Sequence, residues 1–267
     1  MSRPKRRLGQ HFLRDPRLLA RIADALDATP EDTVLEIGAG PGGLTAALAE
    51  RAGRVVAIEK DHDLVADLRA RLPQVEVVEG DALELEWPVV AGAGPGNYLL
   101  AGNIPYNITS PLLDKALTPP RPRRIVFLVQ KEVARRVGAL PGGSEYGALS
   151  IGVQAVARVE VLFTIHAGAF HPPPEVDSAV LRLVPLEQPL IPDGEVRRFR
   201  GLVVGLFGFR RKQLGRALRE LTGWDAARVR ETLAEVGLPV TVRPEGLSPQ
   251  EFVHLHRALV DGGWRSA

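Results

Sequence analysis

The chain has 267 residues, of which 45% are hydrophobic, and a formal net charge of +2, so it can bury a sizeable core in one large and one smaller domain. It contains no run of the roughly 20 apolar residues that cross a bilayer, and its basic start, MSRPKRRLGQHFL, lacks the apolar segment of a secretory signal. Cysteine is absent, which excludes disulfides and thiolate-bound metals and fits a reducing compartment. We therefore expect a cytoplasmic protein that does not enter a membrane.

The charge is distributed unevenly along the chain. Residues 1–21 hold seven Lys or Arg and one Asp, whereas residues 22–190 hold 14 basic and 22 acidic side chains. Residues 191–267 are basic again, with 13 Lys or Arg and nine Asp or Glu. Basic ends around an acidic middle favour a protein whose catalytic part is flanked by regions that bind a polyanion. A plain solvated surface would give the same counts.

The first half of the chain alternates between helical and extended patterns. The predicted strands span 33–37, 54–58, 75–78, 97–101 and 125–129. The predicted helices span 14–28, 43–51, 61–72, a segment from about 110, and 130–137. Strands that alternate with helices predict a parallel, doubly wound sheet of the α/β class.

The second half changes character twice. Two extended segments, 159–165 and 178–184, predict an antiparallel end to the sheet, since the Pro-rich stretch HPPPEVD (171–177) between them is too short and stiff for a crossover helix. The sequence pattern changes again across 185–194, from extended segments to short helices, and we place a domain boundary near residue 190. Four short helices are predicted beyond it, spanning 195–207, 211–221, 226–236 and 249–260.

A glycine loop stands between the first predicted strand and its helix. The stretch EIGAGPG, from Glu36 to Gly42, supplies glycines where the backbone turns tightly and approaches a ligand closely. Glu59 lies 21 residues after Gly38, at the tip of the next strand, which is the offset of an acid that binds a ribose hydroxyl pair. Loop, strand, helix and acid together predict a site for an adenosine-containing cofactor.

The acidic residues around this loop favour one class of cofactor. Asp81 follows the third strand, where its carboxylate can accept a hydrogen bond from an adenine amino group, and Glu36 precedes the glycines. NAD would fit the loop and Glu59 alone, but an acidic set is better matched to a sulfonium and an ammonium than to a pyrophosphate. The pattern therefore favours S-adenosylmethionine, which leaves S-adenosylhomocysteine as its product.

The fourth strand leads into Asn103-Ile104-Pro105-Tyr106 at the same edge of the sheet. An adenine amino nitrogen is a poor nucleophile because its lone pair is delocalised, so acceptors on both N–H bonds would favour a more tetrahedral nitrogen. The Asn103 side-chain oxygen and the Ile104 carbonyl can serve as these acceptors, while Pro105 fixes the backbone. Tyr106 offers a face on which an extruded base can stack. A turn with a buried tyrosine is the competing interpretation.

The sequence resembles the small-subunit ribosomal RNA adenine dimethyltransferases of the KsgA/Dim type along most of its length. The matching stretches are LGQHFLRD (8–15), VLEIGAGPGGLT (34–45), AIEKD (57–61), EGDAL (79–83), GNIPYNITSPLL (102–113), LVQKEVARR (128–136), YGALSI (146–151), FHPPPEVDSAVLRL (170–183) and FGFRRKQL (207–214).

The resemblance implies a fold, a reaction and a setting. The fold is a Rossmann-like class I methyltransferase domain over residues 1–190, with a basic arm at 1–13, followed by an all-α domain over 191–267 that contacts RNA or the ribosome. The reaction is the transfer of two methyl groups from S-adenosylmethionine to each of two adjacent adenosines near the 3′ end of small-subunit rRNA. The setting is a partly assembled small subunit, with a role in ribosome biogenesis.

The resemblance also assigns roles by position. It implies that His11 and Leu13 border the cofactor, that Gly38 contacts its methionine part, and that Phe170 closes the far side of the target pocket. The combined cofactor-binding set is His11, Leu13, Glu36, Gly38, Gly40, Glu59, Asp81 and Asn103. The combined catalytic set is Asn103, Ile104, Pro105, Tyr106 and Phe170.

Basic residues at both ends of the chain are the predicted RNA contacts. They are Arg3, Lys5, Arg6, Arg7, Arg210, Arg211, Lys212 and Arg216. Contacts to phosphate give affinity without reading the sequence, and a solvated face is the alternative interpretation. His254 and His256 are two apart on a predicted helix and do not share a face, so we predict no metal site. We expect a monomer.

Two residues depart from the family pattern and leave alternatives open. Ile104 stands where this family often has Leu, and Ile is equally usual in the related erythromycin-resistance methyltransferases, which modify the large subunit. His11 replaces a frequent Asn. The stretch FGFRRK (207–212) favours the small-subunit family. A large-subunit rRNA methyltransferase and a mainly non-catalytic ribosome-assembly factor are therefore the competing interpretations.

Overall fold

The computed structural model describes residues 5, 9–94 and 96–265. The chain divides into two compact units, one of Met1–Ala134 with Val159–Pro185 and the other of Arg135–Arg158 with Leu186–Ala267. This division differs from the single boundary expected near residue 190. Residues 135–158 belong with the second unit because their helix α7 (Ala148–Gln154) packs on helices α8 (Val196–Phe207) and α11 (Pro249–Asp261) of that unit.

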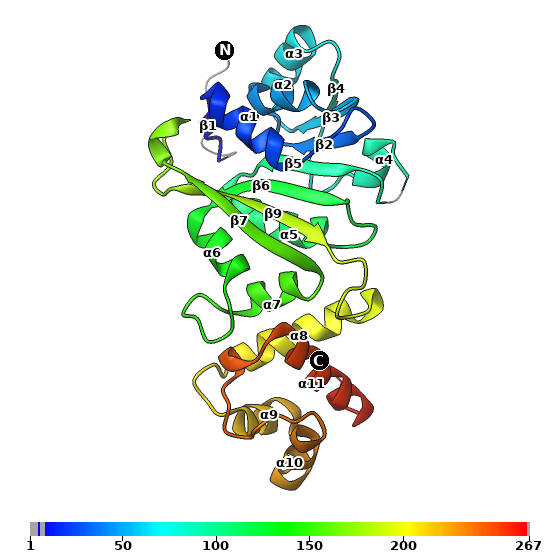
Figure 1. Cartoon of the computed structure of the whole chain (residues 1–267), viewed down its shortest axis with the longest axis vertical. Helices are drawn as coiled ribbons and strands as arrows, with labels where there is room; N and C mark the ends of the chain where they lie inside the picture. Colours follow the sequence, from blue (N-terminus) through cyan, green and yellow to red (C-terminus); the bar gives the residue numbers. More distant parts are fainter. Residues whose placement is uncertain (1–4, 6–8, 95, 266–267) are drawn as a thin grey trace. The chain divides into compact units, whose positions relative to one another are not determined.

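The first unit is built on a seven-stranded sheet with the order β4-β3-β2-β5-β6-β9-β7 (Figure 1). The strands are β2 (Thr33–Ile37), β3 (Arg54–Glu59), β4 (Glu76–Glu79), β5 (Leu99–Asn103), β6 (Arg124–Gln130), β7 (Ala157–Ile165) and β9 (Ser178–Pro185). Each neighbouring pair from β4 to β6 is parallel, whereas β9 runs antiparallel to β6. The predicted α/β class, with a mostly parallel sheet and an antiparallel end, is confirmed.

Helices precede the first parallel strand, connect the parallel strands and follow the last one. They are α1 (Pro16–Ala25), α2 (Gly43–Ala49), α3 (His62–Arg71), α4 (Trp87–Ala91) and α5 (Thr109–Ala116), with α6 (Lys131–Gly138) following β6. Asp15 and Asp61 cap α1 and α3, because each carboxylate accepts a hydrogen bond from a backbone N–H of the first turn. The five-residue α4 was not predicted, since one short turn carries no periodicity; its Trp87 is buried and donates to the Ala82 carbonyl at 2.8 Å.

The register of the parallel strands brings their ends together. Ile37 pairs with Ile58 on one side and with Gly102 on the other, and Glu59 pairs with Glu79. Strands β2, β3, β5 and β6 are buried along most of their length, which explains why they read as continuous apolar runs rather than alternating ones. The residues directly after these ends therefore meet at one edge of the sheet.

A two-residue strand, β1 (Phe12–Leu13), pairs antiparallel with β8 (Phe170–His171) in a second, small sheet. Leu13 lies opposite Phe170, and Phe12 lies opposite His171. Such short strands leave no alternating pattern, so the sequence did not predict them. The pairing fixes the segment before α1 beside the turn that precedes β9.

The second unit is helical, as the sequence predicted. Its further helices are α7 (Ala148–Gln154), α8 (Val196–Phe207), α9 (Leu214–Thr222), α10 (Ala226–Glu235) and α11 (Pro249–Asp261). Phe199, Leu206 and Phe252 are fully buried in this unit. The hydroxyl of Tyr146 donates to the Leu247 carbonyl at 2.7 Å. No helix among the described residues is long and apolar enough to cross a membrane.

Candidate active site

A cavity of about 190 Å³ opens at the carboxyl edge of the parallel strands. It is lined by five stretches that lie apart in the sequence: the segment Gly9–Phe12 and the residues at or just after the ends of β2, β3, β4 and β5. The predicted residues that line it are His11, Gly38, Gly40, Glu59, Asp81, Asn103, Ile104, Pro105 and Tyr106. The cavity thus lies at the edge of the sheet where ligand binding was predicted.

The glycine loop after β2 has backbone angles that favour glycine. Gly38 and Gly40 have φ values of +73° and +55°, in the left-handed region. A Cβ on Gly40 would lie 3.1 Å from the Phe12 ring, so a side chain there would also crowd the N-terminal segment. The loop can therefore approach a ligand with its backbone.

Glu59 lies at the end of β3 and is only 6% exposed. Its carboxylate accepts hydrogen bonds from the Gly40 N–H at 2.7 Å and from the Asp61 N–H at 2.8 Å. Burial raises the pKa of Glu59, against the effect of these donors. Each carboxylate oxygen has a second lone pair, so the group remains able to accept bonds from a pair of ribose hydroxyls.

Asp81 lies after β4 and is held from two sides. Its Oδ2 forms an ion pair with Lys60 Nζ at 2.6 Å, and its Oδ1 accepts from the Leu83 N–H at 2.9 Å. The hydrogen bond from Lys60 lowers the pKa of Asp81 below its ordinary value. Lys115 Nζ fixes the loop beyond it, donating to the Leu83 and Leu85 carbonyls at 2.8 and 2.7 Å. The carboxylate is thus ionised where it lines the cavity.

Asn103 is the last residue of β5 and has a defined side-chain orientation. Its Nδ2 donates to the His11 carbonyl at 2.9 Å. Because the amide nitrogen is engaged with the protein, the Oδ1 is left as the acceptor for a ligand. The His11 ring is held in turn, with its Nδ1 at 2.8 Å from the Pro172 carbonyl. A carbonyl only accepts, so this Nδ1 carries the hydrogen.

The next three residues, Ile104, Pro105 and Tyr106, also line the cavity. The Ile104 N–H donates to the Leu128 carbonyl at 3.0 Å, which orients this peptide against β6. The Tyr106 hydroxyl lies 2.7 Å from Ser178 Oγ, and its ring stacks on the His11 ring with centroids 5.8 Å apart. Burial raises the pKa of Tyr106, so its phenol is protonated at neutral pH. The ring is therefore anchored at both its hydroxyl and one face.

Leu13 and Phe170, two of the predicted residues, lie outside this cavity. They face each other across the β1–β8 pair and are 6% and 4% exposed. Both rest in the hydrophobic core of the first unit. Phe170 packs in the core in this arrangement, and its role in closing a target pocket stays a prediction from the resemblance.

Glu36 is buried behind the glycine loop at 1% exposure. It lines a smaller adjoining cavity together with Gly38, Gly40 and Asn103. Among the described residues its Oε2 has no hydrogen-bond partner, and neither has the buried Thr45 Oγ1. Burial raises the pKa of Glu36 to about 8; the neighbouring Thr45 hydroxyl opposes this shift, and the nearby charge of Glu59 adds to it. The carboxyl is therefore largely neutral at pH 7, which the sequence did not predict.

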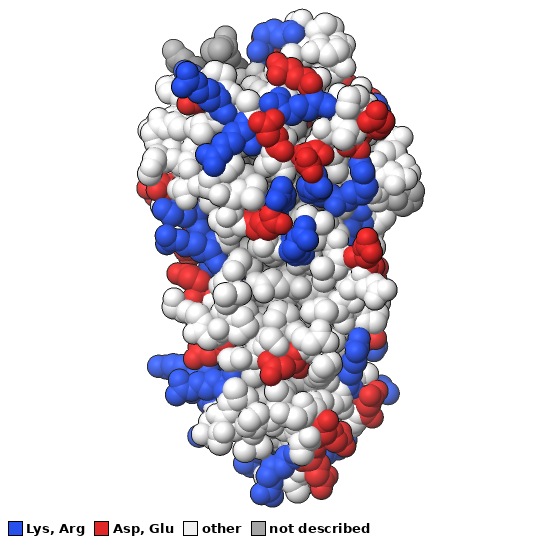
Figure 2. All heavy atoms as spheres, in the orientation of Figure 1, with Lys and Arg blue, Asp and Glu red and all other residues white. Residues whose placement is uncertain are grey.

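Most of the predicted RNA contacts that the structure describes form ion pairs with carboxylates of the protein. Arg3, Arg6 and Arg7 lie outside the described residues. Lys5 forms ion pairs with Asp61 and Asp63, and Arg210 binds Glu245 together with the Gly143 and Ser144 carbonyls. Lys212 and Arg216 share Glu220, and both Arg211 and Arg216 are exposed. Figure 2 likewise shows basic and acidic side chains intermixed on one face.

Several residues at the site were not singled out from the sequence. Gln10 and Lys60 line the cavity, Ser178 anchors Tyr106, and Asp61 binds the N-terminal segment. Each stands next to a residue that was predicted or within a matching stretch, which is the signal that could have found it. Within the described part of the chain, no group of three or more His, Cys, Asp or Glu side chains is arranged to hold a metal ion.

Comparisons with known proteins agree on one family. A family model described as ribosomal RNA adenine dimethylase matches residues 1–251. A relative from Geobacter metallireducens, named ribosomal RNA small subunit methyltransferase A, is 42% identical over 264 residues and covers 97% of this chain and 96% of its own. A relative of the same name from Acidithiobacillus ferrooxidans is 39% identical over 272 residues, covering 100% and 98%.

Solved structures extend the agreement to the whole fold. A dimethyladenosine transferase from Plasmodium falciparum superposes with a TM-score of 0.85 at 26% identity, covering 96% of this chain and 100% of its own. The 23S rRNA methyltransferase ErmE gives a TM-score of 0.73 at 30% identity, covering 93% and 99%. With the glycine loop, the acids after β3 and β4 and the Asn103 motif in one cavity, the chain belongs to the ribosomal RNA adenine dimethylase family.

Proposed function

We propose that this protein transfers methyl groups to the N6 amino groups of two adjacent adenosines near the 3′ end of small-subunit rRNA, giving dimethyladenosine at both. The observation that carries the proposal is the orientation of Asn103, whose amide nitrogen binds the His11 carbonyl and leaves its oxygen for a substrate amine. The names of the relatives support the substrate class. A partly assembled small subunit is the proposed form of the substrate.

The cavity fits S-adenosylmethionine as the methyl donor. The backbone of Gly38 and Gly40 can approach its methionine part, Glu59 retains lone pairs for its ribose, and Asp81 can accept from its adenine. The unpartnered Oε2 of Glu36 places a titratable carboxyl behind the loop, where a cation would favour its ionised form. The cofactor would supply an electrophilic methyl group.

The residues after β5 orient the target amine. Acceptance by Asn103 Oδ1 and the Ile104 carbonyl would polarise both N–H bonds and favour a nucleophilic nitrogen. The bond from the Ile104 N–H to Leu128 holds the Asn103–Ile104 peptide against β6, and Pro105 restricts the backbone just beyond the Ile104 carbonyl. Tyr106, anchored by Ser178, offers a rigid ring for stacking. The methylated nitrogen is acidic enough to lose its proton without a strong base, so alignment provides most of the acceleration.

Substitution of Asn103 tests this role. Asn103→Ala removes the acceptor and should lower methyl transfer by at least about 100-fold, the scale of losing one preorganised polar contact to a reacting group. Cofactor binding, measured by equilibrium dialysis, should largely survive. Asn107→Ala is the matched control, because Asn107 is a second amide lining the same cavity and should be tolerated. Normal turnover by Asn103→Ala would overturn the assignment.

The likeness to ErmE supports a second candidate, methylation of the large subunit. The two candidates separate when purified protein and tritiated methyl donor are incubated with isolated subunits of each kind. We expect label on the small subunit; label on the large subunit alone would overturn the proposed substrate. Small-subunit maturation that continues with Asn103→Ala would instead support a role as an assembly factor that acts by binding.

A further inference from the structure

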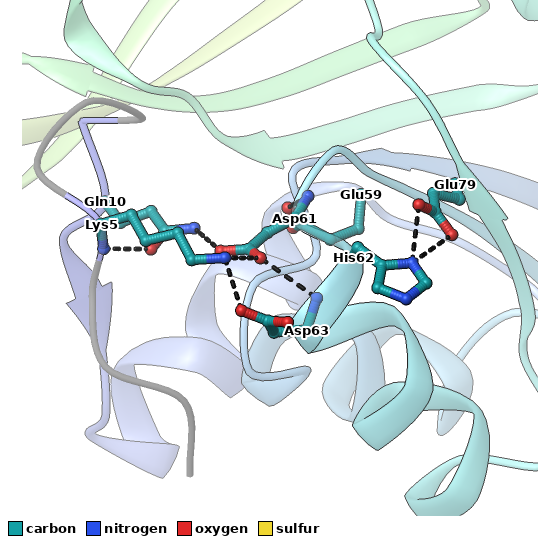
Figure 3. A network of polar contacts seen from close by, with 7 residues as sticks. All are labelled: Lys5, Gln10, Glu59, Asp61, His62, Asp63 and Glu79. Atoms are coloured by element: carbon teal, nitrogen blue, oxygen red, sulfur yellow. Dashed lines mark hydrogen bonds and ion pairs between the residues drawn. The ribbon is translucent and has the colours of Figure 1, made fainter.

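The N-terminal segment, here Lys5 and residues 9–13, is bound to the end of β3 through a polar network centred on Asp61 (Figure 3). The Asp61 side chain is fully buried, in contrast to Asp63 two residues on, whose side chain is 59% exposed. Asp61 Oδ1 accepts from Lys5 Nζ at 2.5 Å, and Asp61 Oδ2 accepts from Gln10 Nε2 at 3.0 Å. A buried carboxylate with two partners from one distant segment ties that segment to the end of β3.

The two residues that bind Asp61, Lys5 and Gln10, are also hydrogen-bonded to each other. The Lys5 backbone N–H donates to Gln10 Oε1 at 2.7 Å, so the Gln10 amide uses its oxygen for Lys5 and its nitrogen for Asp61. Burial by itself would raise the pKa of Asp61, but the hydrogen bonds from Lys5, Gln10 and the Asp63 N–H outweigh it and hold the pKa below its ordinary value. Asp61 is therefore ionised when it binds the segment.

The segment that Asp61 holds leads directly to the proposed catalytic amide. Gly9–Phe12 lines the cavity, and the His11 carbonyl accepts the Asn103 Nδ2 hydrogen bond. Gly9 turns the chain with a φ of +62°, and a Cβ there would lie 3.2 Å from Asn107 Oδ1. The orientation of Asn103 thus depends on where His11 is held, and the nearest polar attachment before His11 is the bond from Gln10 to Asp61.

We propose that Asp61 is a positioning residue, which holds Lys5 and Gln10 so that the His11 carbonyl orients the Asn103 amide for methyl transfer. This rests on the proposed function of the Asn103 site. Asp61 also accepts the Asp63 N–H at the start of α3, a cap that asparagine provides equally well. Its backbone N–H donates to Glu59 Oε1, a contact that a side-chain substitution leaves intact. The charge of the side chain is what the N-terminal segment requires.

Asp61→Asn tests the proposal, with Asp63→Asn as the matched control. Both remove one negative charge from the neighbourhood of Lys5, but Asp63 has no bond to Gln10. In Asp61→Asn, amide hydrogen exchange of residues 9–13 should be about tenfold faster, the effect of losing a charged hydrogen bond. In Asp63→Asn it should change by less than about twofold, as for an exposed ion pair.

Turnover should show the same contrast. Asp61→Asn should lower kcat by about tenfold or more through misplacement of Asn103, while its cofactor dissociation constant stays within about threefold of the wild-type value because the Glu59 contact survives. Adding Lys5→Gln to Asp61→Asn should cause no further loss if both act through one network. A general structural defect would weaken cofactor binding and turnover together.

The exchange measurement needs no substrate, so it separates this inference from the proposed function. If the wild-type protein methylates no RNA but residues 9–13 exchange faster only in Asp61→Asn, the proposed function fails and the attachment stands. If Asp61→Asn exchanges and turns over like Asp63→Asn, the positioning role is wrong. A melting temperature of Asp61→Asn close to that of the wild type shows that the comparison is made on folded protein.

Discussion

The two ends of the Asn103 amide have different tasks. The nitrogen donates to the His11 carbonyl, and the oxygen is left for the substrate. An aspartate at this position would set a carboxylate oxygen against that carbonyl and lose the bond that fixes the side chain. An alanine would lose both contacts. The requirement for an amide therefore follows from the protein side of the contact as much as from the substrate side.

The raised pKa of Glu36 should make the free energy of unfolding depend measurably on pH. Folding raises its pKa from 4.5 to about 8, so the folded protein holds a proton that the unfolded chain releases. Stability due to this group should therefore fall as pH rises from about 4.5 to about 8. Glu36→Gln cannot ionise and should escape this loss.

The measurement is the difference in melting temperature between Glu36→Gln and the wild type across that pH range. The difference should shift in favour of the variant as pH rises. Glu59, whose pKa burial also raises, is present in both proteins, so the effect of its own burial is common to them. A difference that stays constant from pH 5 to pH 8 would show that Glu36 is ionised in the folded protein at neutral pH.

The close spacing of β2 and β5 brings the glycine loop and Asn103 together. At Gly102, just before Asn103, a Cβ would lie 2.6 Å from the Ile37 carbonyl oxygen and 2.8 Å from Ile104 Cδ1. Gly102→Ala should therefore lower the free energy of unfolding by about 1–3 kcal/mol, the cost of forcing an extra carbon into a packed core.

Urea unfolding measures this cost, with Gly168→Ala as the control. Gly168 has nothing within 4 Å of its Cβ position and should change stability by less than about 0.5 kcal/mol. Equal stability of the two variants would mean that β2 and β5 can separate without cost, and that the close packing of these strands does not hold the site together.

The sequence predicted the elements that carry long patterns and missed the short ones. The strand at 33–37 has the predicted bounds, because its apolar run ends sharply at the glycine loop. The pairing of β1 with β8 and the helices α4 and α7 went unpredicted, since two to seven residues give little periodicity. The site residues at strand ends were predictable from spacing. The attachment of Asp61 to Gln10 was not, because it joins residues 51 positions apart through side chains alone.

At the scale of the whole molecule, the charge distribution is less informative than the sequence suggested. The basic ends of the chain predicted free cations for RNA, but Lys5 is bound to carboxylates beside the cavity and Arg210 is bound within the helical unit. Among the described members of the predicted set, Arg211 and Arg216 are exposed. Binding of the helical unit to RNA therefore remains a proposal, whereas the family is shown by matches that span both units.

The central claim is that this protein dimethylates two adjacent adenosines of small-subunit rRNA. Its most direct test is mass mapping of modified nucleosides on small subunits from cells that lack the protein, before and after incubation with purified protein and S-adenosylmethionine. We predict two adjacent unmethylated adenosines near the 3′ end that each gain two methyl groups. Adenosines already dimethylated in the deficient cells, or a gain at any other site, would contradict the claim.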